Sequence, residues 1–337
     1  MTPDLTKIVM FTDIHYGLRN NSRDHNDSCE RFIKWMISEA KKKGIKTCVF
    51  GGDYHHVRAA INISTLNYSV SGLKLLNDNF DHTFFIIGNH DLFYRDKYEI
   101  HSLPYIDQFP NITVVDKIIT HKNVSFIPWL VADDWKKISK LKSDYIFGHF
   151  ELPKFKMNAM VEMPDHGLLN SDHFVNQKMV FSGHFHKRQN QGKIWYIGNC
   201  FPHNYSDAWD DERGIMLWDS KTGPSFSAWP DAPKYRTLNL SDVVANPTAL
   251  IDNRTFAKII IDINISYEDL SFIKELLERD LHAKEIQMVA ERNEEFEELD
   301  NGKIDFESVD SIVISHLNSI ESNTIDKKEL IRIYQEI

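Results

Sequence analysis

Short apolar runs alternate with amphipathic stretches along the first 230 residues of the chain. Residues 29–43 and 64–76 repeat their apolar positions at helical spacing, which predicts two helices. The apolar runs have the length and composition of buried strands, and they cover residues 8–11, 47–50, 83–87, 124–127, 145–147, 179–181, 194–197 and 215–218. The order strand, helix, strand, helix, strand, followed mostly by strands, predicts a layered α/β fold whose second half is β-rich.

The pattern changes near residue 230. Pro224, Pro230 and Pro233 predict a linker there. Beyond it the pattern is strand, helix and strand, over residues 256–265, 267–282 and 285–290. This order predicts a small α/β module.

The remaining chain has a different character. Six of the ten residues 291–300 are acidic, which predicts a solvated linker. Two short helical patterns follow, formed by Ile312, Leu317 and Ile320 and then by Leu330, Ile331 and Tyr334. We therefore predict a larger domain over residues 1–230, a small α/β domain over 231–295, and a linker with a helical segment over 296–337.

Composition places the chain among ordinary globular proteins. Its 337 residues are 42% hydrophobic, which is enough for a full core. No uncharged apolar run approaches the length needed to cross a bilayer, and the N-terminus lacks the pattern of a signal peptide. Cys29, Cys48 and Cys200 are scattered, which argues against a disulfide framework or a thiolate zinc site. We expect a reducing, cytoplasmic location.

The net charge of −10 is unevenly distributed. Residues 1–230 hold 26 acidic and 27 basic side chains, a net of +1, whereas residues 231–337 hold 23 and 12, a net of −11. A phosphate substrate is therefore not repelled by the first part. Because no strong basic stripe is present, we expect only modest DNA affinity from this chain alone.

Five predicted strands end in potential metal ligands. Strand ends are where a layered α/β fold presents its functional loops, and glycine before a ligand lets the backbone turn close to an ion. The clusters are Asp13-Ile14-His15, Gly52-Asp53, Gly88-Asn89-His90-Asp91, Gly148-His149 and Gly183-His184-Phe185-His186.

These clusters contain a mixed set of nitrogen and oxygen donors, which suits manganese, iron or zinc better than calcium. Alternate strand residues point to one side, so His184 and His186 can reach the same site. The seven predicted ligands are Asp13, His15, Asp53, Asn89, His149, His184 and His186. Seven ligands exceed the need of one ion but suit two ions that share a carboxylate, a pair that can clamp a phosphate and activate water.

Each motif alone also has a purely structural interpretation. Asp13 and His15 could belong to a turn, and Asp53 could cap a helix. His149 alone would more often be a hydrogen-bonded core histidine than a ligand. The metal interpretation depends on finding all five motifs together and in this order.

That ordered set resembles the calcineurin-like metallophosphoesterase superfamily, whose motifs are D-x-H, G-D, G-N-H-[DE], a lone G-H and G-H-x-H. In more detail the chain is similar to the SbcD-type nuclease subunits of double-strand-break repair, including the recombination nuclease subunits of T-even bacteriophages. The supporting stretches are residues 52–59, 127–129, 148–152 and 196–198. The resemblance implies a β-sandwich flanked by helices, a small α/β capping domain and a C-terminal helical tail.

The resemblance also assigns roles to the predicted site residues. His90 would face the phosphate and help to protonate the leaving oxygen, and Asp91 would orient His90. His56 falls where some relatives have a phosphate-contacting histidine and others an aspartate, so it is a third catalytic candidate. One ion would be held by Asp13, His15 and His186, the other by Asn89, His149 and His184, with Asp53 between them.

The resemblance implies a manganese-dependent DNA nuclease, with magnesium as a possible substitute, that acts as a 3′-to-5′ exonuclease and single-strand endonuclease. Its implied partner is an SMC-like coiled-coil ATPase of the SbcC type, bound through the C-terminal helices, in a heterotetramer that contains a homodimer of the nuclease. If the chain is encoded by a phage, its location would be the host cytoplasm.

Two other functions remain open at this point. The same cage could serve a small-substrate phosphatase or nucleotide phosphodiesterase, because a fold does not fix a substrate. The chain could also be a non-catalytic regulatory subunit of the ATPase. The additional C-terminal module argues against the first alternative, and the complete ligand set with His90 beside Asn89 argues against the second.

Overall fold

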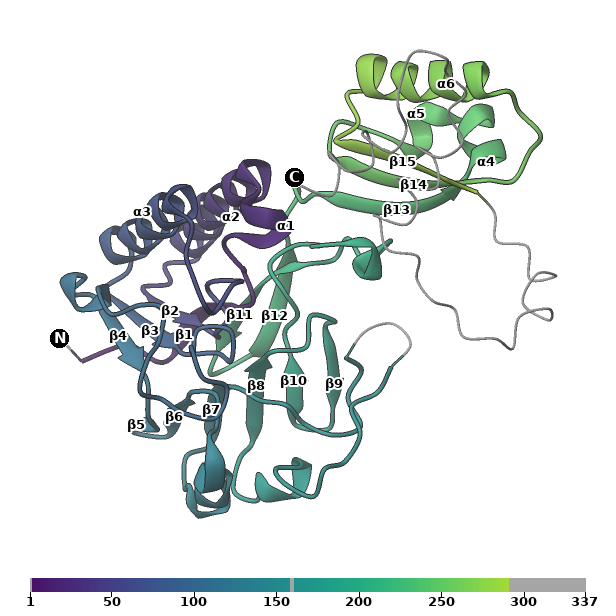
Figure 1. The fold of residues 1–337 in the computed structure, drawn as a ribbon. Coiled ribbons are helices and arrows are strands. Elements are labelled where there is room, and N and C mark those ends of the chain that lie inside the picture. The colour runs from purple at the N-terminus through teal and green to yellow at the C-terminus, as the bar shows by residue number, and fades with distance from the viewer. Residues whose placement is uncertain (1, 158–160, 291–337) are drawn as a thin grey trace, which may run out of the picture. The chain divides into compact units, whose positions relative to one another are not determined.

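The fold is that of a computed structural model, which describes residues 2–157 and 161–290 (Figure 1). Residues 2–290 belong to one compact unit. The predicted acidic linker and the predicted helical segment over 296–337 lie outside the described residues.

Two six-stranded mixed sheets form the larger part of the described chain (Figure 1). The first has the order β12-β11-β1-β2-β3-β4, and the second has the order β5-β6-β7-β8-β10-β9. The first sheet comprises β1 (Lys7–Phe11), β2 (Thr47–Phe50), β3 (His82–Ile86), β4 (Ile112–Val115), β11 (Gly214–Asp219) and β12 (Gly223–Ala228). The second comprises β5 (Ile119–His121), β6 (Val124–Ile127), β7 (Tyr145–His149), β8 (Met179–Gly183), β9 (Gln189–Gln191) and β10 (Ile194–Tyr196).

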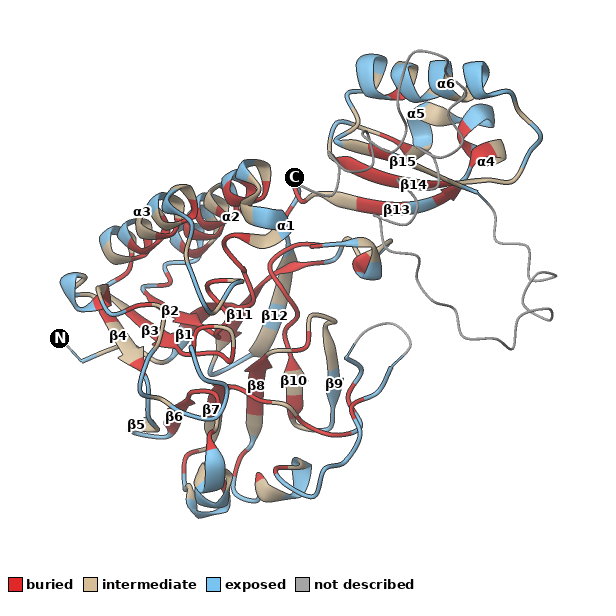
Figure 2. Ribbon diagram, viewed as in Figure 1, coloured by how far each residue is buried: buried red, intermediate tan, exposed pale blue. Residues whose placement is uncertain are grey.

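The central strands of the first sheet are buried on both faces (Figure 2). Val9 and Phe11 of β1 belong to one core cluster with residues of α2 (Arg23–Lys42) and α3 (Ile63–Asn79). Ile8 and Met10 belong to another, with aromatic residues of the second sheet. Because successive strand residues point to opposite faces, β1 packs between the helix layer and the second sheet. This arrangement explains its uninterrupted apolar sequence.

Short helices and loops cover the outer face of the second sheet. Ile146 and Val180 there share a core cluster with Phe150, Phe155 and Ile138. The short elements of this part of the chain are α1 (Leu18–Asn21) and the 3-10 helices η1 (Ile106–Gln108), η2 (Ala132–Lys140), η3 (Ser171–His173) and η4 (Tyr205–Asp207).

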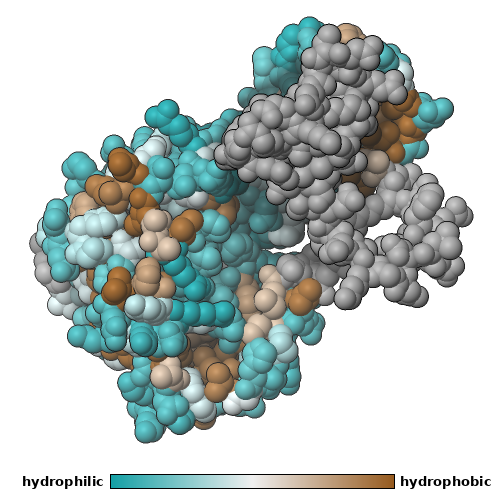
Figure 3. All heavy atoms as spheres, in the orientation of Figure 1, coloured by the Kyte–Doolittle hydropathy of each residue, from teal (hydrophilic) through white to brown (hydrophobic). Residues whose placement is uncertain are grey.

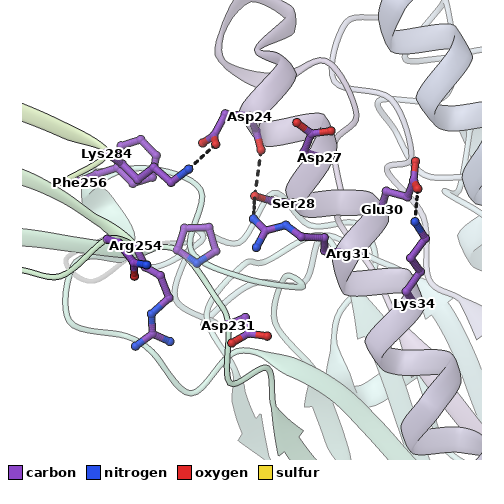
Figure 4. Close-up of a pocket in the computed structure, with 12 residues that line it drawn as sticks. Asp24, Asp27, Ser28, Glu30, Arg31, Lys34, Asp231, Arg254, Phe256 and Lys284 are labelled. Atoms are coloured by element: carbon purple, nitrogen blue, oxygen red, sulfur yellow. Dashed lines mark hydrogen bonds and ion pairs between the residues drawn. The ribbon is translucent and has the colours of Figure 1, made fainter. Parts of the chain in front are cut away.

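A third, parallel sheet has the order β13-β14-β15 and its own apolar core. Polar contacts join it to the first part. The Lys284 ammonium lies 2.7 Å from the Asp24 carboxylate of α2 (Figure 4). The Arg19 guanidinium lies 4.2 Å from the ring centre of Phe256. The elements are β13 (Lys234–Asn239), α4 (Leu240–Ala245), α5 (Pro247–Leu250), β14 (Thr255–Ile261), α6 (Tyr267–Asp280) and β15 (Glu285–Ala290).

The predicted α/β fold class is confirmed, with differences in individual elements. The helix predicted from residue 29 begins at Arg23, because the Ser22 side chain caps its first turn by accepting a hydrogen bond from the His25 backbone. Pro224 was predicted to lie in a linker but belongs to β12, paired with Trp218. Because β12 is the edge of its sheet, a residue without an N–H group is tolerated there.

Figure 3 shows a largely hydrophilic face over the described residues, with apolar groups scattered among polar ones. Among the described residues, no helix is both long and apolar enough to cross a membrane.

The contact between the two large sheets predicts where a substitution should destabilise the fold strongly. Phe84 and Phe126 come from opposite sheets, are fully buried and stack with ring centres 3.8 Å apart. Replacing Phe126 by Ala should lower the free energy of unfolding by about 3–5 kcal/mol, because it leaves a cavity between the sheets. Urea denaturation followed by circular dichroism measures this loss. The matched control is Phe272→Ala, at an exposed position of α6, which should change stability by less than about 0.5 kcal/mol. Equal losses for both variants would contradict this prediction.

Candidate metal centre

Six of the seven predicted ligands lie in loops that follow strands, and His149 is the last residue of β7. Strands β1, β2 and β3 run parallel to one another, as do β7 and β8, so within each sheet the carboxyl ends lie at a common edge. Backbone hydrogen bonds hold the first two loops together, from Asp13 N to Gly52 O at 2.9 Å and from His15 N to Asp53 O at 3.2 Å. The topology therefore brings residues from positions 13 to 186 to one place.

Asp13, His15 and His186 form the first group. Their potential ligand atoms all lie within 4.8 Å of one another. The Nε2 atoms of the two histidines are 3.3 Å apart, and His186 Nε2 is 4.0 Å from an Asp13 oxygen. Burial lowers the pKa of His15 well below its usual value, which favours the neutral imidazole that binds metals.

Asn89, His149 and His184 form the second group. The Asn89 Oδ1 atom lies 3.0 Å from His149 Nε2 and 2.9 Å from His184 Nδ1. The other ring nitrogen of His149 is 2.7 Å from the Gly51 carbonyl, to which only an N–H can donate. In neutral His149 the lone pair on Nε2 therefore points toward the Asn89 oxygen. Two lone pairs aimed at one spot are the arrangement that a cation satisfies.

Asp53 lies between the two groups. Its Oδ2 atom is 3.8 Å from His15 Nε2 and 3.5 Å from His149 Nε2. Burial raises the pKa of Asp53, but the adjacent His149 and, to a smaller extent, His15 lower it, and the pKa ends well below its usual value. Burial, the largest single cause, lowers the pKa of His149, but the Asp53 carboxylate, the Asp13 charge and the Gly51 carbonyl together raise it to about 9. A divalent cation bound between these groups would displace that proton.

The backbone around this centre is strained. Positive φ angles are found at Asp13 (52°), His15 (52°), Asp53 (63°) and His184 (92°). Side-chain-bearing residues in this region cost of order 1–3 kcal/mol each and persist where the surroundings fix them, most often at functional sites. Four of the seven predicted ligand residues thus have a conformation that folding alone would disfavour.

Gly52 explains how Asp53 approaches the second group. Its φ is +103°, and a Cβ atom built on it would collide with the His149 ring and lie 2.9 Å from the Gly88 backbone. Only glycine leaves space for these three loops to meet. The expectation that glycine permits a close approach therefore holds at this position.

His90 lies beside His15 of the first group and beside Asp53, and it is half-buried. Its backbone N–H donates to Asp53 Oδ1 at 2.8 Å, and its ring Nδ1 lies 2.8 Å from the His56 carbonyl oxygen. That carbonyl can only accept, so Nδ1 carries the proton and Nε2 is the free basic nitrogen. The rings of His56 and His90 stack with centres 5.6 Å apart, and the His15 ring lies edge-on to His90 at 4.9 Å.

Asp91 has a different partner from the predicted one. It was expected to orient His90, but His90 is held by the His56 carbonyl. The buried Asp91 carboxylate instead accepts hydrogen bonds from four backbone N–H groups, those of Gly88, Asp53, Tyr54 and His55, at 2.8–3.2 Å. Asp91 binds the backbone rather than His90 because a buried carboxylate requires several hydrogen-bond donors, and the backbone N–H groups of this turn supply them.

Glu151 is a site residue that the sequence reasoning missed. Its Oε2 atom is 3.1 Å from His184 Nε2, so the carboxylate fixes the His184 tautomer and leaves Nδ1 free to face Asn89. In the sequence, its position two residues after His149 is the feature that could have indicated this role.

His25 and His203 were also missed. His25, in the first turn of α2, places Nε2 3.0 Å from the His15 carbonyl and so supports the strained loop. His203 is fully buried, and its ring centre lies 5.6 Å from that of His15 and 5.4 Å from that of His186. Neither residue belongs to a motif, and only the tertiary structure reveals them.

Comparison with curated proteins finds two viral relatives. Exonuclease subunit 1 of Enterobacteria phage T4 is 25% identical over 342 residues, which cover 97% of this chain and 97% of that protein. Putative phosphoesterase 244L of Invertebrate iridescent virus 6 is 24% identical over 262 residues, which cover 70% of this chain and 86% of that protein. A dimetal phosphatase structure from Danio rerio is 12% identical, the match covers 64% of this chain and 92% of that chain, and the TM-score is 0.39.

Comparison with protein families matches residues 6–188 to the calcineurin-like phosphoesterase family. The matched span is more than half of the chain and contains all five clusters of predicted ligands. This protein therefore belongs to the calcineurin-like phosphoesterase family.

Proposed function

We propose that this protein is a DNA nuclease that hydrolyses phosphodiesters with two divalent cations, of which Mn²⁺ is the preferred ion. The observation that carries the proposal is the position of the Asp53 carboxylate between two groups of nitrogen and oxygen donors. Two cations held by these residues would supply Lewis acidity and a water-derived nucleophile near neutral pH. In this proposal Asp13, His15 and His186 hold one ion, and Asn89, His149 and His184 hold the other.

The chain's own side chains would complete the reaction. His90, with its proton on Nδ1 in the resting state, has its Nε2 free to take up a proton and pass it to the departing sugar oxygen. The His56 carbonyl fixes the orientation of that ring, and the His56 side chain stacks on it. Asp91 acts at a distance from the substrate, by holding the loop that bears Asp53.

DNA is the proposed substrate, with 3′-to-5′ exonuclease and single-strand endonuclease activity. The relative from phage T4 is called an exonuclease subunit, and the match covers 97% of this chain and 97% of that protein. The loop after His90 supports the proposal, because it exposes Phe93 and Tyr94 next to Arg95 and Lys97. Exposed aromatic groups among cations are typical of surfaces that bind single-stranded nucleic acid.

A partner subunit is part of the proposal, since the phage relative is itself called a subunit. We propose an SMC-like coiled-coil ATPase that binds the segment with Ile312, Leu317, Leu330 and Ile331, in an assembly with two copies of this chain. The phosphatase alternative predicts a different result, namely hydrolysis of a small aryl phosphodiester but not of DNA. Incubating the purified chain with Mn²⁺ and labelled single-stranded DNA distinguishes the two.

The role of His90 can be tested by replacing it with Ala. We expect cleavage of labelled DNA to fall by about 10²–10⁴-fold, because a positioned general acid contributes that much, while the Mn²⁺ content stays near that of the wild type. Quenched-flow cleavage assays and elemental analysis measure the two quantities. The control is His282→Ala at an exposed position, which should leave both unchanged. Undiminished cleavage by His90→Ala would remove this residue from the mechanism.

The metal centre can be tested without an activity assay. At a Mn²⁺ concentration 100 times its Kd, the folded protein should gain about 2.7 kcal/mol of stability, which raises the thermal unfolding midpoint. Asp53→Asn keeps the shape but removes the central charge, so the Mn²⁺-induced shift should fall to less than half. Asp133→Asn, whose side chain is 77% exposed, should keep the full shift. A wild-type midpoint that does not respond to Mn²⁺ would argue against the site.

A further inference from the structure

An apolar pocket of about 420 Å³ opens beside the second group of predicted ligands. Its size falls in the range of small-molecule binding sites. The walls include Trp129, Leu130, Trp135, Phe150 and Leu169. The rim carries Arg95, Asp96 and Glu151, and one wall is the ligand His149 itself.

The pocket and the metal centre share side chains. The Trp129 ring centre lies 5.2 Å from that of His184 and 6.0 Å from that of His149, so one tryptophan contacts both ligands. Arg95 Nη2 donates to Glu151 Oε2 at 2.8 Å, and the same oxygen lies 3.1 Å from His184 Nε2. A group inside the pocket would therefore lie close to a phosphate held at the metal centre.

The aromatic walls are held in place rather than free to collapse. Trp129 is buried, its indole N–H donates to the Arg95 carbonyl at 3.1 Å, and the Arg95 guanidinium lies 5.5 Å from its ring centre. The Trp135 ring packs edge-on against His173 at 5.1 Å. Fixed aromatic faces with a few polar groups at the rim suit a flat heteroaromatic ring that has polar edges.

We propose that this pocket binds one nucleobase of the substrate strand, unstacked from its neighbours, while the adjacent phosphate lies at the metal centre. The inference rests on the nuclease function proposed above and adds a position for the base to it. A base can enter only after it leaves its stack, so the pocket favours single-stranded, frayed or mismatched ends over paired ones. The site recognises the base by stacking, which tolerates any sequence because every base has a π face.

The test uses single-stranded oligonucleotides that differ only at one nucleotide. An abasic tetrahydrofuran residue replaces the nucleotide on either side of the scissile phosphate in turn, and Mn²⁺-dependent kcat/KM is measured for each. We expect the abasic residue at one of the two positions to lower kcat/KM by about 5- to 100-fold, the equivalent of one base–aromatic stack. The other position should show little effect.

Substitutions in the pocket test whether its side chains cause the difference in kcat/KM between normal and abasic strands. The Trp135→Ala variant should cleave the normal strand about as slowly as it cleaves the abasic strand. The Trp135→Phe variant should recover most of the difference in kcat/KM between the two strands. Leu168 lines the pocket but is 56% exposed, so Leu168→Asp tests the same surface at a position where folding tolerates a charge. The matched control is Trp209→Ala, an exposed tryptophan outside the pocket, which should keep the wild-type discrimination.

A small substrate separates this inference from the function on which it rests. All four variants should keep the wild-type Mn²⁺-induced rise in the thermal unfolding midpoint, because that rise needs only the metal centre. The small diester, bis(p-nitrophenyl) phosphate, is offered to the wild-type protein alone, because its nitrophenyl ring is itself a flat aromatic group that can stack in the pocket. Equal cleavage of normal and abasic DNA by the wild type, at both positions, would overturn the base pocket and leave the nuclease intact. Hydrolysis of the small diester without any DNA cleavage would overturn both.

Discussion

The buried carboxylate of Asp91 is the contact on which the arrangement of the site depends. It accepts hydrogen bonds from backbone N–H groups in two loops, those after β2 and β3. Burial is the main cause that raises its pKa, to about 7, and the charge of Asp53 adds to this, while the backbone donors oppose the shift. One side chain thus fixes two loops, and the loop after β2 carries the unfavourable positive φ of Asp53. Without it, the loop of Asn89 would lose three hydrogen bonds to the loop of Asp53, those from the backbone N–H groups of Asp53, Tyr54 and His55.

The motifs at strand ends could be predicted from sequence because they combine two local signals. An apolar run that stops at glycine, followed by Asp, Asn or His, indicates a strand and its functional loop at once. The topology then brings these loops together, because neighbouring parallel strands have their carboxyl ends at the same edge of the sheet. All seven predicted ligands therefore meet in the structure, and Asp53 lies between the two groups that the resemblance implied.

Other features could not be predicted, because they depend on partners distant in sequence. Asp91 belongs to a predicted motif and Glu151 follows another, but the groups that they contact are set by how the loops fold back. His25 and His203 belong to no pattern, and their roles arise from packing against His15. Strand β13 (Lys234–Asn239) was not predicted, because it contains few apolar residues among its polar ones. Its hydrogen bonds to β14, rather than its own sequence pattern, hold it in the extended conformation.

The predicted ligands are divided between the two large sheets. Asp13, Asp53 and Asn89 follow strands of the first sheet, whereas His149 and His184 come from the second. Cations held between them would act as a cross-link, comparable to a disulfide in restricting how far the two halves of the sandwich can separate. Loss of the cations and loosening of the sheets would then be coupled. When the cations are removed, the backbone amides of β7 and β8 would exchange their hydrogens faster, under conditions in which the protein is still folded.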